Sequence, residues 1–237
     1  MKILLSTALL LVQLLHIEAR GPPFDSLSIS ASIPVSVSFP NTNLISFPVA
    51  IRFLILILLP LSNKCGAVTT SEWGAMDPRL VEALEQPVNL VIIQHTVSQE
   101  CYTDERCESI VRNIQWYHMM DLGWKDIAYN FLIGGNGKVY EGVGWQNVGS
   151  HSLGYNRRSI GIAFIGDFRT KEPTPAALRA AQRLLKCGVN KRHLPRNYFL
   201  VGHMQVRPTE SPGARLMELI KQWPNWIEDI SVIDSGN

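Results

Sequence analysis

Residues 90–96 have the sequence Leu-Val-Ile-Ile-Gln-His-Thr, in which four apolar residues run directly into three polar ones. An unbroken apolar run of this kind is typical of a central β-strand that is covered on both faces. The polar residues that end the run, Gln94, His95 and Thr96, are expected where the strand opens into a groove. This stretch therefore predicts both a buried sheet and the position of a binding site.

Further elements are predicted on both sides of this strand. Asn136-Gly137 lies between two apolar runs and predicts a β-hairpin over residues 129–141. Residues 160–166 form another apolar run, and Gly161 within it indicates the close approach of a neighbour. Trp73 is expected to anchor the core. The remaining elements are a helix that begins at Thr103-Asp104-Glu105 and places Cys107, Ile110, Val111, Ile114 and Tyr117 at helical spacing, a helix that begins at Thr174-Pro175, a strand over 198–201, and a last amphipathic helix after Pro212-Gly213.

The order of these elements predicts a single α/β domain with a central mixed β-sheet and about three main helices on its faces. We place this domain at residues 65–230 and a short tail at 231–237. Neither a G-x-G-x-x-G nor a G-K-[ST] motif occurs, so no nucleotide-binding loop is predicted. The net charge of +2 and the scattered basic residues also argue against a nucleic-acid partner.

The N-terminal region has the composition of a targeting segment. Residues 1–19 resemble a signal peptide, with Lys2 before an apolar run and Ala19 at a plausible cleavage site. Residues 20–64 are predicted to be a low-order linker, rich in Ser and Pro over 21–48. Within it, residues 49–62 form a second hydrophobic segment, which resembles another signal-peptide core. A membrane anchor in this segment is the alternative, so the chain is expected to be secreted, or else a single-pass membrane protein.

Four cysteines follow the leader, and an even number in a secreted chain favours two disulfides. Cys101 and Cys107 enclose a short loop and form the natural local pair. Cys65 and Cys187 then remain as a long-range pair. Four reduced thiols in a cytosolic protein are the alternative, which the leader argues against.

Several motifs resemble the peptidoglycan recognition protein family. The resemblance covers roughly residues 65–230, and it implies a fold related to phage-type N-acetylmuramoyl-L-alanine amidases. The motifs are Ser71-Glu72-Trp73-Gly74-Ala75, Gln86-Pro87-Val88, the Cys101/Cys107 pair, residues 123–131, Tyr140-Glu141-Gly142 and Ser211-Pro212-Gly213.

The resemblance also identifies the positions of a zinc site. Catalytic members of the family bind Zn²⁺ through two His and one Cys, and the metal lowers the pKa of its bound water to about 7. The matching positions here are Gln94, His203 and Ser211, of which only His203 is a strong zinc ligand. The resemblance therefore implies no metal cofactor and no amidase activity, and it leaves Tyr129 and Thr209 as vestigial catalytic positions. A zinc site rebuilt from His95, His118 or His151 is the alternative.

The ligand-binding half of the site is better preserved. Aromatic rings, imidazoles and amides suit the apolar and hydrogen-bonding parts of a muramyl peptide. The positions that match the family's muropeptide contacts are His95, His118, Gly123, Trp124, Tyr129, Val143, His151 and Asn156. For any one of these residues taken alone, a structural role is the alternative: a helix cap for His118, a core position for Trp124, a loop contact for His151.

The preference for one stem peptide is left open by the sequence. Gly123-Trp124 resembles the pair found in members that accept diaminopimelate-type stems. Those members usually also carry an arginine at the position of Val143, where it pairs with the extra carboxylate. Valine cannot form this pair, which favours Lys-type stems.

The leading hypothesis is a secreted immune pattern-recognition protein that binds bacterial peptidoglycan without cleaving it. The resemblance implies signalling to an extracellular serine-protease cascade or to a receptor. A zinc-dependent amidase and a membrane-anchored receptor are the alternatives.

Overall fold

The computed structural model describes residues 65–234. The predicted signal peptide, the linker and the second hydrophobic segment lie outside this range. Among residues 65–234, no helix has the length and apolar character needed to cross a membrane.

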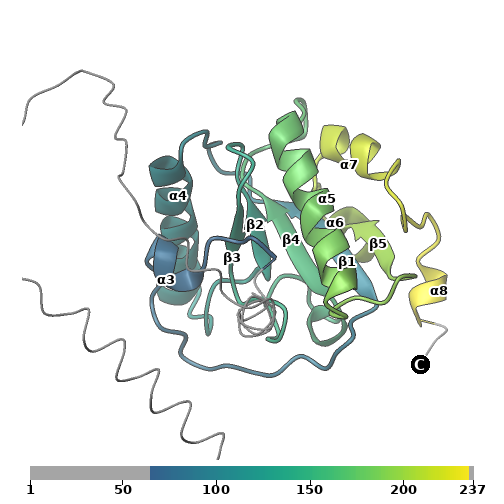
Figure 1. Ribbon diagram of the computed structural model, residues 1–237, viewed down its shortest axis with the longest axis horizontal. Helices are drawn as coiled ribbons and strands as arrows, with labels where there is room; N and C mark the ends of the chain where they lie inside the picture. The colour runs from purple at the N-terminus through teal and green to yellow at the C-terminus, as the bar shows by residue number, and fades with distance from the viewer. Residues whose placement is uncertain (1–64, 235–237) are drawn as a thin grey trace, which may run out of the picture. The chain divides into compact units, whose positions relative to one another are not determined.

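The described residues form a five-stranded mixed sheet in the order β3-β2-β4-β1-β5 (Figure 1). Strand β1 (Leu90–His95) pairs in parallel with β4 (Ile160–Phe164) on one side and with β5 (Phe199–Gly202) on the other. Strand β2 (Phe131–Ile133) is parallel to β4 and forms the predicted hairpin with β3 (Val139–Glu141). All six residues of β1 are buried, as the apolar run predicts.

Alternate residues of β1 enter different parts of the core. Val91 and Ile93 belong to the largest cluster, together with apolar residues of α5 (Pro175–Asn190) and α7 (Ala214–Ile220). Leu90 and Ile92 belong to a second cluster. This division follows from the two-residue period of a strand.

A third apolar cluster joins β2 and β3 to α4 (Asp104–Trp116) and α3 (Thr70–Trp73). Trp73 is fully buried there, and its indole Nε1 donates to the Glu141 backbone oxygen at 2.8 Å, so the predicted anchor is confirmed. The two predicted helix starts are also confirmed. The side chains of Thr103 and Thr174 accept hydrogen bonds from the first turns of α4 and α5.

The predicted apolar face of α4 is wrong at its end. The helix passes into a π-helical turn, η1 (Tyr117–Asp121), which changes the rotation per residue. At the start of this turn Tyr117 is 50% exposed, whereas Gln115, one turn along the helix from Val111, is buried.

The C-terminal segment also differs from the prediction. The chain continues in regular structure past residue 230, because α8 (Ser231–Asp234) follows and Ile233 packs on Leu90, Ile92 and Val201. The helix after Gly213 is therefore not the last one.

Both predicted disulfides are present. Cys101–Cys107 ties the loop after β1 to the first turn of α4, and Cys65–Cys187 ties the start of the described chain to α5. Two short helical turns, η2 (Asn156–Arg158) and α6 (His203–Val206), complete the fold.

Candidate functional site

A pocket of about 400 Å³ lies at the carboxyl end of β1, which we call the inner pocket. Ligands of parallel sheets commonly bind at this end of the strands. Predicted site residues from distant parts of the sequence meet here. They are Gln94, His95, His118, Trp124, Tyr129, His151, His203, Thr209 and Ser211.

Gln94 and His95 both line the inner pocket, although the side chains of neighbouring strand residues point to opposite faces of a sheet. The strand ends at His95, so the pocket surrounds the strand end and contacts both residues. The Gln94 amide nitrogen donates to the His151 backbone oxygen and to Ser152 Oγ, both at 3.1 Å. Its Oε1 is buried without a hydrogen-bond partner in the described residues.

Ser211 is also part of the scaffold. Its Oγ accepts a hydrogen bond of 3.1 Å from the backbone N–H of His95, and its own N–H donates to Thr209 Oγ1 at 3.2 Å. The serine hydroxyl therefore joins the loop before α7 to the end of β1. Thr209 supports that loop from within.

The imidazoles of the inner pocket are neutral at neutral pH. Burial lowers the pKa of His118 and of His203 to about 4, and nearby Arg207 adds to the effect on His203. Burial lowers the pKa of His151 to about 3, and His203 contributes further. Burial likewise raises the pKa of Tyr129 to about 12, so its phenol keeps its proton.

His118 holds a small aromatic cluster together. Its Nδ1 accepts a hydrogen bond of 3.0 Å from the Ala128 backbone N–H, which leaves the proton on Nε2. The ring stacks on Trp124 at 4.9 Å and meets Tyr129 edge-on at 5.6 Å, measured between centroids. Trp124 is 37% exposed and is therefore a wall of the groove, not a core residue.

His151 lies directly against strand β4. A Cβ atom at Gly161 would stand 2.4 Å from its Cγ, so only glycine leaves room for the ring. This contact is the close approach that the glycine in this strand predicts. The ring's Nε2 is buried without a partner in the described residues.

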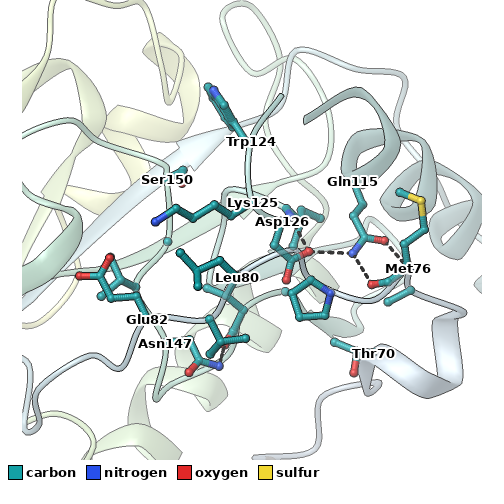
Figure 2. A pocket seen from close by; sticks show the side chains of 18 of the residues that line it. Thr70, Met76, Leu80, Glu82, Gln115, Trp124, Lys125, Asp126, Asn147 and Ser150 are labelled. Atoms are coloured by element: carbon teal, nitrogen blue, oxygen red, sulfur yellow. Dashed lines mark hydrogen bonds between the residues drawn. The ribbon is translucent and has the colours of Figure 1, made fainter. Parts of the chain in front are cut away.

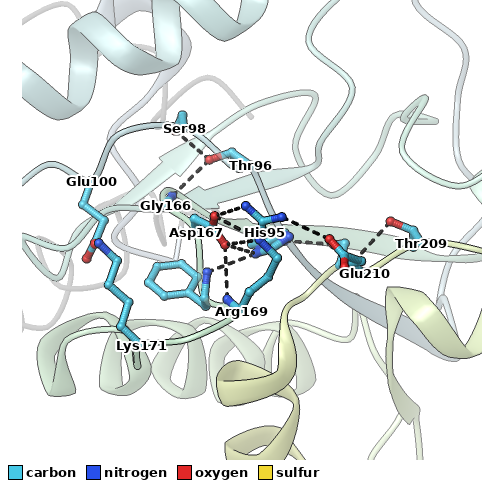
Figure 3. A network of polar contacts seen from close by, with 12 residues as sticks. His95, Thr96, Ser98, Glu100, Gly166, Asp167, Arg169, Lys171, Thr209 and Glu210 are labelled. Carbon is cyan, nitrogen blue, oxygen red and sulfur yellow. Dashed lines mark hydrogen bonds and ion pairs between the residues drawn. The ribbon is translucent and has the colours of Figure 1, made fainter.

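A charged network forms the other wall of the inner pocket (Figure 3). His95 Nδ1 accepts from the Phe168 backbone N–H at 3.2 Å and lies 3.9 Å from Asp167 Oδ1. Burial is the main cause that lowers the pKa of His95, against the opposing effect of Asp167. Arg169 binds the Asp167 carboxylate through two nitrogens and Glu210 through a third. No sequence motif points to this clamp, because Arg169 and Glu210 are 41 residues apart and become neighbours only in the fold.

A second pocket of about 790 Å³, the outer pocket, adjoins the inner one (Figure 2). Trp124 and Ser150 line both. The remaining predicted contacts Gly123, Val143 and Asn156 lie here and not in the inner pocket. The structure thus places the eight predicted contacts along two adjoining pockets that share a wall.

The outer pocket also contains residues that the sequence analysis missed. Residues 70–82 form one side of it, with Leu80 and Val81 exposed. Asp126 accepts hydrogen bonds from Gln115 and from the Ile127 N–H, and Gln115 in turn holds both backbone groups of Met76. Glu82 pairs with Arg157 at 2.9 Å. Lys125 follows Trp124 directly and lines the same pocket.

The residues present do not fit a zinc ion. At the three matching positions the structure offers one imidazole, one amide and a hydroxyl that already accepts a backbone hydrogen bond. A tetrahedral site of this class needs a thiolate and a second imidazole in those places. Within residues 65–234, no group of three or more His, Cys, Asp or Glu side chains is arranged to hold a metal.

Comparison with known proteins identifies the class of domain and then the family. Residues 84–214 match the model of the N-acetylmuramoyl-L-alanine amidase domain family. A peptidoglycan recognition protein of Trichoplusia ni is 51% identical over 176 residues, which cover 74% of this chain and 97% of that protein. The chain therefore belongs to the peptidoglycan recognition protein family.

Solved structures agree with this assignment. Manduca sexta peptidoglycan recognition protein-1 is 46% identical with a TM-score of 0.69, over 72% of this chain and 98% of that one. Peptidoglycan recognition protein-LE, solved in complex with tracheal cytotoxin, a monomeric diaminopimelic acid-type peptidoglycan, is 42% identical with a TM-score of 0.68, over 68% and 96%. The predicted α/β amidase-like fold is confirmed.

Proposed function

We propose that this protein binds muropeptides of bacterial peptidoglycan along the inner and outer pockets and does not cleave them. The observation that carries the proposal is the hydrogen bonding of Gln94 and Ser211 within the fold. At the two positions where a zinc amidase needs metal ligands, an amide and a hydroxyl instead hydrogen-bond to His151, Ser152 and the His95 backbone.

The rest of the pocket remains suited to binding. Neutral imidazoles donate and accept hydrogen bonds without the cost of burying a charge. The His118–Trp124–Tyr129 cluster offers aromatic surface beside them. A muramyl peptide, with alternating apolar groups and amides, has the matching chemistry.

The experiment combines metal analysis with binding on one sample. We expect purified protein, dialysed against Zn²⁺ and then buffer, to retain far less than one zinc per chain. It should bind muramyl peptides without releasing free peptide from peptidoglycan. One zinc per chain together with steady peptide release would overturn the proposal in favour of an amidase.

A gain-of-ligand variant sharpens this test. Gln94→His with Ser211→Cys replaces the two weak donors by an imidazole and a thiol, and it should bring retained zinc to about one per chain. Gln94→Asn with Ser211→Ala is the matched control, which changes the same positions without adding ligands. Equal zinc in both double variants would show that the site geometry has been lost as well as the ligands.

We further propose that the chain acts outside the cell in innate immunity and signals to a serine-protease cascade or a receptor. The leader-like residues 1–19 and the family's immune role support this proposal. N-terminal sequencing of the mature protein tests the extracellular location, because a start beyond residue 62 excludes a membrane anchor in residues 49–62. An intact segment 49–62 recovered with membranes would instead favour the anchored receptor.

A further inference from the structure

Lys125 stands apart from the other charged residues of the two pockets. It is exposed and lines the outer pocket, and it has no ion-pair partner among residues 65–234. The other cations of the groove are already bound. Arg157 pairs with Glu82, and Arg169 is held between Asp167 and Glu210.

The position of this amino group is favourable for contact with a ligand. Figure 2 shows the Lys125 side chain extending across the pocket, with its nitrogen lying between Ser150 and Glu82. Ser150 and Trp124 line both pockets, so the ammonium lies near the point where the pockets meet. A ligand that follows the groove from one pocket to the other passes this point.

Glu82, which lies on the side toward which Lys125 extends (Figure 2), already pairs with Arg157 at 2.9 Å. Asp126 lies toward Gln115, from which its carboxylate accepts a hydrogen bond of 2.7 Å. Asp77 and Glu141 also line the pocket. The inner pocket contributes neutral imidazoles near the junction. Among the described residues, Lys125 is thus the cation without an acidic partner at the junction of the two pockets. Its ammonium group is suited to pair with an anionic group on the ligand.

We propose that Lys125 is a specificity-determining residue that binds a free carboxylate of the peptidoglycan stem peptide. This inference rests on the proposed function. It assigns to Lys125 the charge recognition that Val143, which lines the same pocket, cannot supply. Stem peptides offer two such carboxylates: the α-carboxylate of the γ-linked D-glutamate at the second position, and the side-chain carboxylate of diaminopimelate at the third.

The experiment uses matched ligands that differ only in charge. One pair of muramyl tripeptides has the second-position carboxylate free or amidated, and the other pair has the diaminopimelate carboxylate free or amidated. Calorimetric titration of the full chain should show tighter binding of the free acid in at least one pair, by roughly three- to tenfold. The pair that shows the difference identifies which carboxylate is bound.

Variants then assign the difference to Lys125. Lys125→Met should bring that acid-to-amide ratio close to one and should hardly change the affinity for the amide. Lys186→Met, which removes an exposed lysine on α5, is the control for net charge and should leave the ratio unchanged. A ratio in Lys125→Met equal to that of the wild type, or ratios of one for the wild type in both pairs, would overturn the inference.

These outcomes are separable from failure of the proposed function. Equal binding of acid and amide forms by the wild type removes the role of Lys125 but leaves muropeptide binding intact. Absence of binding to every muropeptide removes both.

Discussion

The inner and outer pockets share a wall but use their polar groups in opposite ways. In the inner pocket, Gln94, Ser211 and His118 are buried and hydrogen-bonded to the backbone. In the outer pocket, the charged side chains of Lys125 and Arg157 are exposed. The first pocket therefore presents buried neutral groups beside a charged wall in which Arg169 and Glu210 are already paired, and the second presents an exposed lysine without an acidic partner in the described residues. This difference implies that shape and hydrogen bonding select the ligand in one pocket and charge refines the choice in the other.

The largest effect should come from disturbing the inner pocket at Gly161. Gly161→Ala places a methyl group against the His151 ring, where a Cβ atom would stand 2.4 Å from Cγ. Because β4 is central, the ring has to move, and we expect a loss of about 1–3 kcal/mol in the free energy of unfolding. Muropeptide affinity should fall by roughly tenfold or more, as a displacement of this size disturbs the contacts of His151.

A matched glycine separates stability from binding. Gly188→Ala on α5 would place a Cβ atom 2.5 Å from the Trp145 ring, outside both pockets. It should destabilise the fold similarly and leave the affinity of the folded protein unchanged. Urea unfolding and calorimetry measure the two quantities. Equal losses of affinity in both variants would contradict a specific role for the His151 position.

The second effect concerns the pH dependence of stability. The pKa values of His118, about 4, and His151, about 3, lie below the ordinary value of about 6.5, so the unfolded chain binds protons first as the pH falls. The free energy of unfolding is therefore highest above about pH 6.5, where both imidazoles are neutral in the folded and the unfolded chain, and it decreases progressively toward pH 4. Urea unfolding between about pH 7.5 and about pH 4.5 should therefore show a continuous decrease.

A single variant assigns part of this decrease to the inner pocket. His118→Gln keeps an acceptor for the Ala128 N–H but does not titrate, and it should reduce the decrease by about 1–3 kcal/mol. Arg183→Gln on the exposed face of α5 should leave the pH profile unchanged. An identical profile in His118→Gln would show that this imidazole is not held neutral in the fold.

The parts of the molecule that follow local sequence patterns are better predicted than those that depend on contacts between distant residues. The apolar run of β1, the Asn-Gly hairpin and the threonine caps are local patterns, and each appears in the structure. Tyr117 does not share the buried face of α4, although it is apolar and at helical spacing, and the buried residue near the helix end is the polar Gln115. The short helix α8 is missed because Ile233 packs on Leu90, Ile92 and Val201, which are distant in the sequence.

The site shows the same division. The inner-pocket positions could be identified because they carry distinctive residue types within recognisable motifs. The Arg169 clamp and Lys125 could not, because an exposed charged residue acquires meaning only from its neighbours in the fold. Sequence reasoning considers Val143 alone for charge recognition, since only the fold shows that Lys125 lies in the same pocket.

The smallest expected effect tests whether the outer pocket can accept a second cation. Val143 is partly exposed in that pocket, and Val143→Arg would add a planar guanidinium with a fork of N–H donors for a carboxylate. We expect affinity for a diaminopimelate-type muropeptide to rise a few-fold relative to the Lys-type muropeptide, measured by calorimetry. Equal affinities before and after the change would contradict the assignment of Val143 to the third stem position. Val143→Gln, which adds length and polarity without charge, is the control.

Combining Val143→Arg with Lys125→Met shows whether the two cations serve one carboxylate. If both contact the diaminopimelate carboxylate, Val143→Arg should gain more in the Lys125→Met background than in the wild type, because the carboxylate then lacks another partner. If Lys125 binds the second-position carboxylate instead, the two changes should be additive in free energy. A smaller gain in the double variant would mean that Lys125 and the introduced guanidinium cooperate, which two like charges crowded on one carboxylate should not do.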